Sequence, residues 1–328
     1  MKKILGIAVA SATMATSAMA AVTTNMENPL FIPKAGEFVS KTGAGVMYKQ
    51  ADHTDALKIK NRDGATEFPV WRFTEDFGYG ITDRLSTYVL LGWTQNDDID
   101  RKGMHRGRLG LNYRAIETLD NVAWDVYGEA YLSGVSPMKG SVKLTNGNVD
   151  FKYDNFSNGR WGAVLGTKIG KTWSKFTASL FAEYLQTFGN HNNKIDTSAL
   201  AFMGFPDEIA VDLKSTSELT IGTSAFYQLN GDWSFGGGFR FVEHTDNGVK
   251  SIHTQGVPAM AAAPLLAATK DMNDGWDEYI LSASIANQVT DSVQIALFGE
   301  YTFDDSHKNS QNGTDVKAEV GVRANVRF

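Results

Sequence analysis

The clearest pattern along the chain is a strict alternation of apolar and polar positions over its last thirteen residues. A period of two is typical of a β-strand with one apolar and one polar face. Strands in soluble sheets have about five or six residues, whereas a tilted strand needs about 9 to 11 to cross a bilayer. This segment is therefore long enough to span a membrane. Its apolar face holds Val316, Ala318, Val320, Val322, Ala324, Val326 and Phe328.

The same alternation recurs along most of the chain. Five short turns and six longer polar segments separate the alternating stretches, which together predict about twelve strands. In the second strand the alternation turns Glu75 outward, which predicts a bulge or an earlier strand end there. Residues 142–153 alternate weakly and fit a hairpin arm above the rim. The predicted strands are 37–50, 67–81, 85–95, 106–116, 122–133, 160–171, 176–187, 218–229, 233–244, 277–288, 293–304 and 316–328.

This all-β pattern predicts a closed antiparallel up-and-down transmembrane β-barrel. In lipid every backbone N–H and C=O must pair internally, so a membrane sheet closes on itself. Short periplasmic turns, long extracellular loops and an even strand number are typical of bacterial outer-membrane barrels. Six of the seven tryptophans fall near predicted strand ends, where interfacial aromatic girdles lie. These are Trp93, Trp124, Trp161, Trp173, Trp233 and Trp276.

The first twenty residues have the pattern of a secretory signal peptide. Lys2 and Lys3 precede a short apolar run, and Ala18-Met19-Ala20 fits a cleavage site. We expect residues 1–20 to be removed. Residues 21–36 then form either a periplasmic lead-in or a small plug, and residues 37–328 form the barrel.

These features resemble Gram-negative outer-membrane β-barrel proteins of the porin or transport-barrel type. The most specific match is the final strand with its carboxy-terminal Phe328, and the turn at residues 81–85 is a weaker one. The resemblance implies a location in the bacterial outer membrane. It also assigns to Phe328 the signal read by the barrel-assembly machinery. Lipid is the expected partner of the outer wall, with lipopolysaccharide as a candidate at the loop-side rim.

Composition narrows the classes of function. The chain has no cysteine, which excludes disulfides, Cys-ligated metals and a thiol nucleophile. Its 31 basic and 37 acidic residues give a net charge of -6, so the basic footprint of a nucleic-acid-binding protein is absent. A mean hydropathy of -0.24 is too polar for a bundle of transmembrane helices. No motif implies a cofactor.

The predicted interior charges are nearly balanced. Nine basic and eight acidic side chains point into the lumen in the predicted register. They fit an aqueous channel whose opposed charges orient polar solutes, and equally an ion-pair network that holds a small barrel together. The lack of a dominant sign argues against a channel for polyanions. The inward charges are Lys41, Arg72, Asp76, Arg108, Arg114, Asp125, Glu129, Lys168, Glu183, Glu218, Arg240, Glu278, Glu300, Lys317, Glu319, Arg323 and Arg327.

Two predicted loops, 199–211 and 257–268, are unusually apolar. Water-facing loops rarely carry such side chains without a burying partner. The loops are expected either to form an apolar entrance over the mouth or to pack on themselves as a short capping helix. The histidines and the acid pairs Asp97-Asp98 and Asp304-Asp305 fall in loops or near strand ends, where a solvated role is the simpler interpretation.

The predicted function is a porin-like channel for passive diffusion of small solutes, amphipathic or hydrophobic ones among the candidates, without enzymatic activity. Bore size, mixed lumen charges and the mouth loops would set its selectivity. Two alternatives stay open. One is a non-transporting structural or adhesive barrel, and the other is a hydrolase at the rim, where His244 and His307 are the residues to test.

Overall fold

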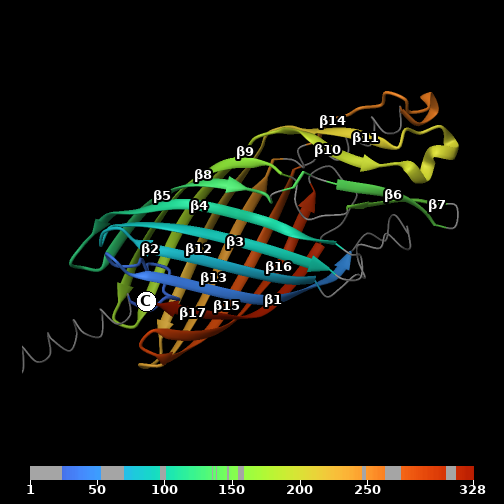
Figure 1. The fold of residues 1–328 in the computed structure, drawn as a ribbon. Coiled ribbons are helices and arrows are strands. Elements are labelled where there is room, and N and C mark those ends of the chain that lie inside the picture. Colours follow the sequence, from blue (N-terminus) through green and yellow to red (C-terminus); the bar gives the residue numbers. More distant parts are fainter. Residues whose placement is uncertain are drawn as a thin grey trace, which may run out of the picture.

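A computed structural model of the protein describes residues 24–52, 70–96, 101–134, 136–137, 139–145, 148–153, 159–245, 249–262, 275–307 and 315–328. Within these ranges, twelve strands form a closed barrel (Figure 1). Their order around the ring is β1-β17-β16-β15-β13-β12-β9-β8-β5-β4-β3-β2. Every neighbouring pair is antiparallel. The predicted up-and-down barrel of about twelve strands is confirmed.

The barrel strands are long, as a tilted membrane crossing requires. The shortest have 11 residues and the longest has 17. Their bounds are β1 Phe38–Asp52, β2 Val70–Gly80, β3 Leu85–Asn96, β4 Arg101–Glu117, β5 Val122–Leu132, β8 Trp161–Trp173, β9 Phe176–Thr187, β12 Thr216–Gln228, β13 Trp233–His244, β15 Trp276–Thr290, β16 Val293–His307 and β17 Asp315–Arg327.

The apolar side chains at alternate positions of the barrel strands face outward. Leu165, Leu281 and Leu297 lie on three different strands and are 69%, 49% and 56% exposed. An outer wall of this kind is stable only against hydrocarbon, which places the barrel in the outer membrane. The predicted girdle tryptophans whose side chains are described are also exposed, namely Trp93, Trp124, Trp161, Trp173 and Trp233. The side chain of Trp276 lies outside the described residues.

The expected bulge or early strand end at Glu75 is wrong. β2 pairs without a register shift along both β1 and β3. Glu75 instead stays on the outer wall and accepts hydrogen bonds from the hydroxyls of Ser40 (2.7 Å) and Thr42 (2.6 Å) on β1. These two donors satisfy the carboxylate oxygens, which lowers the cost of placing an acid on a lipid-facing wall.

A second sheet of five strands lies beyond the barrel end that is opposite the carboxy terminus (Figure 1). Its order is β14-β11-β10-β6-β7, and only the β10–β6 pair is parallel. The β6–β7 hairpin occupies the segment whose weak alternation suggested a hairpin arm. The elements formed from the long loops are β6 Lys139–Thr145, β7 Asn148–Tyr153, β10 Asn190–Asp196, the 3-10 helix η1 Ser198–Met203, β11 Glu208–Leu213 and β14 Val249–Ile252.

This second sheet has a small apolar core of its own. Ile209, Val211 and Leu213 of β11 pack against Ile252 of β14. Only part of the apolar stretch 199–211 is therefore covered: Ile209 and Val211 belong to this core and Phe205 packs against it, whereas Phe202 and Met203 of η1 are exposed. Among the described residues, no helix has the length and hydrophobicity to cross a membrane.

Candidate functional site

One end of the lumen is occupied by the chain's own segment that precedes β1. We call residues 24–33 the inner segment. Asn25 donates a hydrogen bond to Gln228 of β12 (2.9 Å) and accepts one from Gln294 of β16 (2.9 Å). These partners lie beside the short turns and the carboxy terminus, so the inner segment fills the periplasmic end.

Several side chains at this end are as buried as those of a protein core. The side chains of Gln294 and Asn325 are fully buried, and Met26 and Leu30 of the inner segment are each 2% exposed. Protein interiors at this burial are close-packed, with few voids larger than a water molecule. These buried contacts hold the inner segment against the barrel wall at this end of the lumen.

Five basic side chains of the barrel wall bind the inner segment, and we call them the basic ring. Four of them donate to backbone carbonyl oxygens of the segment. The fifth, Arg323, forms a two-point ion pair with the carboxylate of Glu27, with N–O distances of 3.1 and 2.6 Å. Asn325 also donates to Glu27 (2.7 Å). The backbone contacts are Lys41 to Met26 O (2.7 Å), Lys168 to Pro29 O (2.9 Å), Arg114 to Leu30 O (2.6 Å) and Arg327 to Thr24 O (3.3 Å).

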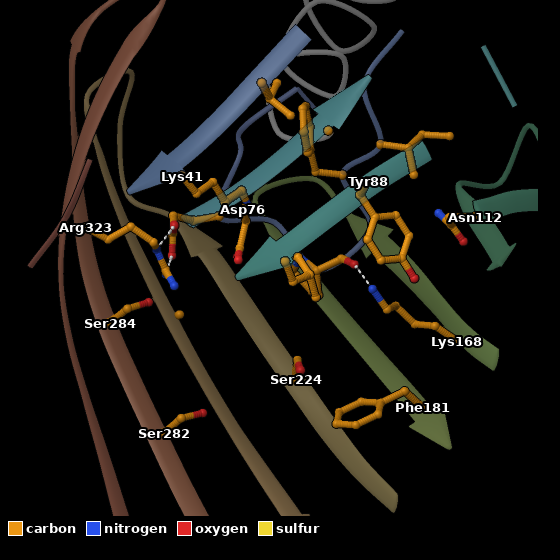
Figure 2. Close-up of a pocket in the computed structure, with 18 of the residues that line it drawn as sticks. Lys41, Asp76, Tyr88, Asn112, Lys168, Phe181, Ser224, Ser282, Ser284 and Arg323 are labelled. Atoms are coloured by element: carbon orange, nitrogen blue, oxygen red, sulfur yellow. Dashed lines mark hydrogen bonds and ion pairs between the residues drawn. The ribbon is translucent and has the colours of Figure 1, made fainter. Parts of the chain in front are cut away.

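A cavity of about 600 Å³ lies in the lumen, with Glu27 and Phe31 of the inner segment among its lining residues. Figure 2 shows its two unlike sides, with Lys168 and Tyr88 on one and small hydroxyl side chains on the other. The small side chains are Ser224 of β12, Ser282 and Ser284 of β15, with Gly236 of β13 between these strands. Small residues here leave the space that defines the cavity.

The opposite side of the cavity carries a charged cluster centred on Arg108. Its guanidinium pairs with Glu183 (2.8 Å) and Glu129 (3.1 Å). The Tyr88 hydroxyl donates to Glu129 (2.6 Å), and the Tyr127 hydroxyl donates to Glu183 (3.3 Å). The cluster fixes one base of β4 and two acids of β5 and β9, so it presents oriented charge to the cavity with both carboxylates ion-paired to Arg108.

Further ion pairs lie elsewhere on the inner wall. Arg72 pairs with Glu319 (2.6 Å), and Arg240 pairs with Glu300 (2.9 Å). Arg114 pairs with Asp125 (2.6 Å) beside the inner segment. The interior thus combines an ion-pair network with a cavity, so the two interpretations of its charges are not exclusive.

Twelve of the predicted lumen residues make contacts on the inner wall or with residues preceding β1. They are Arg72, Arg108, Arg114, Asp125, Glu129, Lys168, Glu183, Arg240, Glu300, Glu319, Arg323 and Arg327. The side chain of Lys317 lies outside the described residues.

Four aromatic side chains lie against glycines of the neighbouring strand, at directly paired positions of the inner wall. A Cβ at Gly110 would lie 2.5 Å from the ring of Tyr88, and one at Gly166 would clash with the ring of Tyr127. The glycines let the rings lie close to the wall, which keeps the cavity open. Sequence patterns missed these contacts because they depend on cross-strand register. The pairs are Tyr88–Gly110, Tyr127–Gly166, Phe181–Gly222 and Phe298–Gly321.

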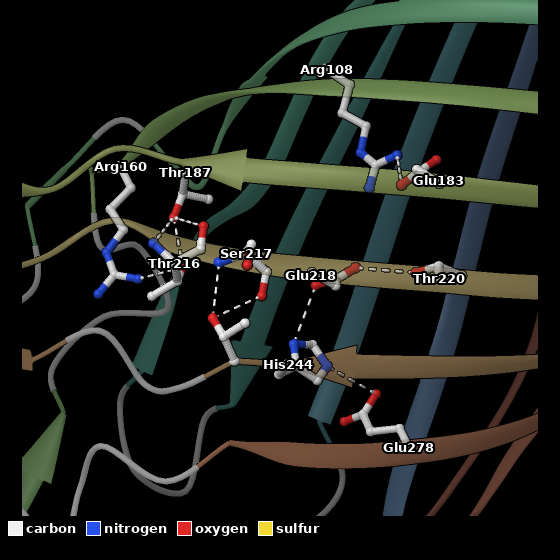
Figure 3. A network of polar contacts seen from close by, with 11 residues as sticks. Arg108, Arg160, Glu183, Thr187, Thr216, Ser217, Glu218, Thr220, His244 and Glu278 are labelled. Carbon is white, nitrogen blue, oxygen red and sulfur yellow. Dashed lines mark hydrogen bonds and ion pairs between the residues drawn. The ribbon is translucent and has the colours of Figure 1, made fainter.

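Polar contacts join β12, β13 and β15 at the loop-side rim (Figure 3). His244 lies between two acids, with its Nδ1 3.3 Å from Glu218 and its Nε2 3.8 Å from Glu278. Within the described ranges, no group of three or more His, Asp or Glu side chains is arranged to hold a metal ion.

A second histidine cluster lies on the five-stranded sheet. Asp212 accepts hydrogen bonds from His253 (2.9 Å) and Ser251 (3.0 Å), and its other oxygen lies 3.0 Å from His191. The hydrogen bond from His253, supported by those from His191 and Ser251, lowers the pKa of Asp212 to about 2. The remaining histidines are not described at side-chain level, and these are His53, His105 and His307. Asp97-Asp98 and the Asp304-Asp305 side chains also lie outside the described residues.

The barrel resembles solved outer-membrane proteins in fold. An outer membrane channel from Pseudomonas putida F1 matches with a TM-score of 0.54 at 11% identity, covering 90% of this chain and 96% of that one. The NanC porin matches with a TM-score of 0.47 at 8% identity, covering 86% and 98%. The translocator domain of the autotransporter NalP from Neisseria meningitidis gives 0.43 at 10% identity, covering 97% and 98%.

No protein-family model and no curated protein matches the chain. At these identities the likeness shows the fold alone. The chain has the fold of an outer-membrane β-barrel.

Proposed function

We propose that the protein is an outer-membrane channel through which small solutes diffuse passively. The observation that carries the proposal is the cavity of about 600 Å³ inside a closed barrel. Ion-paired charges line one side of it and small hydroxyl side chains line the other. These groups can replace the water contacts that a solute loses when it enters the cavity. Solutes enter from the loop side, and selectivity follows from the cavity's width and charge. The proposed role is non-enzymatic.

Passage through the whole barrel requires the inner segment to move. The buried contacts of Asn25 and Leu30 hold this segment inside the periplasmic end of the lumen. The same packing favours a second candidate function, a barrel that does not transport and serves as a membrane anchor for the five-stranded sheet. Conductance separates the two.

The test uses the absence of cysteine from the chain. Ser282→Cys places a single thiol in the cavity, whereas Leu281→Cys places one on the lipid-facing wall of the same strand. The purified variants are inserted into planar bilayers and treated with a charged methanethiosulfonate reagent. We expect conductance steps that fall after modification of Ser282→Cys and stay unchanged for Leu281→Cys, which serves as the matched control.

Two outcomes would count against a channel. One is that neither variant, nor the unaltered protein, conducts above the bare bilayer. The other is that modification of the two thiols has the same effect, which would place the conducting path outside the cavity. Hydrolysis of lipid or peptide substrates that is lost in His244→Ala would contradict the non-enzymatic role.

A further inference from the structure

The basic ring makes an unusual set of contacts at the periplasmic end of the lumen. Its five members come from β1, β4, β8 and β17, and each donates to an oxygen of the inner segment. Four of these oxygens are backbone carbonyls and the fifth contact is to the Glu27 carboxylate. The ring therefore already binds a cluster of oxygen acceptors that the chain supplies itself.

The wall around the ring carries fewer acids than bases. Asp125 pairs with Arg114, and Asp76 lies opposite Lys41 in the register of β1 and β2. Glu117 at the end of β4 also lies 3.8 Å from Arg114. Against five bases, these three acids leave an excess of two positive charges on this part of the described wall. Glu27 of the inner segment, and Glu37 just after it through its ion pair with Arg327 (3.2 Å), offset part of that excess. Withdrawal of the segment would uncover a cationic constriction.

We propose that the basic ring is a binding site for small organic carboxylates, and that the inner segment occupies it as an internal competitor. A carboxylate solute replaces the Glu27 carboxylate and the carbonyl oxygens, which releases the segment and opens the periplasmic end. Rings of Lys and Arg favour anions in pores, and guanidinium groups bind carboxylates at two points, as Arg323 does here.

The proposal rests on the proposed channel and names its solute class. The lumen as a whole has nearly balanced charge, so the site suits small anions rather than polyanions. Figure 2 shows Lys41 and Arg323 near one another and Lys168 across from them, an arrangement that can hold a solute with carboxylates at two ends.

The first experiment measures release of the inner segment in detergent. Met26→Cys and Leu30→Cys each place a single thiol at a position that is 2% exposed, and Gly231→Cys in an open turn is the control. Labelling by N-ethylmaleimide is followed with succinate and with its neutral analogue succinamide, at equal ionic strength. We expect succinate, and not succinamide, to speed labelling of both buried thiols several-fold while Gly231→Cys is unaffected.

Variants of the ring identify the anion site. In Lys168→Met or Arg323→Gln the succinate dependence of labelling is expected to fall, whatever the labelling rate without succinate. Equal effects of succinate and succinamide, or no effect of either, would overturn the proposal. A succinate effect that survives both ring variants would overturn it as well.

The second experiment separates this proposal from the proposed function. Glu27→Gln keeps the shape of the side chain but removes the charge that Arg323 binds, and Glu208→Gln on the exposed part of β11 is the matched control. In planar bilayers under a KCl gradient we expect Glu27→Gln to conduct more than the control, with a reversal potential that shows anion preference. Conductance without anion preference would leave the channel standing and overturn the carboxylate site. No conductance in any variant would overturn the channel, and the labelling experiment would still decide the site.

Discussion

The contact between Tyr88 and Gly110 predicts a specific stability cost for adding one methyl group inside the barrel. In Gly110→Ala the new Cβ would lie 2.5 to 2.8 Å from two ring carbons and the hydroxyl oxygen of Tyr88, and those are its three nearest neighbours. Ordinary contact begins at 3.4 Å, so the ring must retreat by about 1 Å. Its hydroxyl donates to Glu129 over 2.6 Å, and the same retreat lengthens this hydrogen bond beyond its useful range.

The two losses set the magnitude. Overpacking costs about 1–3 kcal/mol, and a hydrogen bond to a charged group contributes about 1.5–3 kcal/mol. Since partial relaxation offsets both, we expect Gly110→Ala to lower the free energy of unfolding by about 3 kcal/mol. Urea unfolding from lipid vesicles, followed by tryptophan fluorescence, measures it.

A double-mutant cycle tests the cause. Tyr88→Ala removes the ring, so adding Gly110→Ala to that variant should cost close to nothing. Gly231→Ala is the control for the glycine-to-alanine change itself, because a Cβ there meets nothing within 4 Å. If Gly110→Ala costs as much without the ring as with it, the steric reasoning is refuted.

Three further predictions concern other parts of the molecule. Because its folded pKa is lowered to about 2, ionised Asp212 stabilises the five-stranded sheet fully above its unfolded pKa of about 3.8, and this stability is lost as pH falls through about 2. Amide exchange of residues 208–213 should therefore rise in acid, and Asp212→Asn should remove that dependence. Arg114→Met leaves Asp125 buried without its ion-pair partner and should cost about 3–5 kcal/mol in urea unfolding. Phe328→Ala should reduce the folded, heat-resistant fraction assembled in cells.

Each of these has an outcome that contradicts it. An unchanged acid profile in Asp212→Asn would show that other groups control the sheet. Adding Asp125→Leu to Arg114→Met should recover most of the loss, since it removes the buried charge, and failure to recover would point to the lost contact with Leu30. Assembly of Phe328→Ala at the level of Leu119→Ala, a variant of an exposed turn residue, would argue against the assembly signal.

The sequence predicts the barrel well because each strand carries its own signal. The alternation in residues 316–328 can be seen without knowing any other part of the chain, and it sets which charges face inward. Contacts between strands carry no such signal. Glu75 breaks the alternation of apolar residues on its face, and only the position of Ser40 and Thr42 on the paired strand shows why it needs no bulge.

The candidate site could be predicted only in part. The alternation along the strands predicts that Lys168 and Arg323 face the lumen. Their hydrogen-bond acceptors, however, belong to a segment with no periodic pattern, more than 130 residues away in sequence. The sequence therefore predicts residues 21–36 only as either a periplasmic lead-in or a small plug. The apolar stretch 199–211 was similarly ambiguous, because a local excess of hydrophobic residues does not say which surface will cover it.

The position of Glu27 also has a consequence for the order of folding. Its partners, Arg323 and Asn325, belong to the last strand of the chain, and that strand closes the seam against β1. The inner segment, although it is synthesised before every strand, can reach its final place only after the last strand has joined the ring. Seating of residues 24–33 therefore marks the completion of assembly.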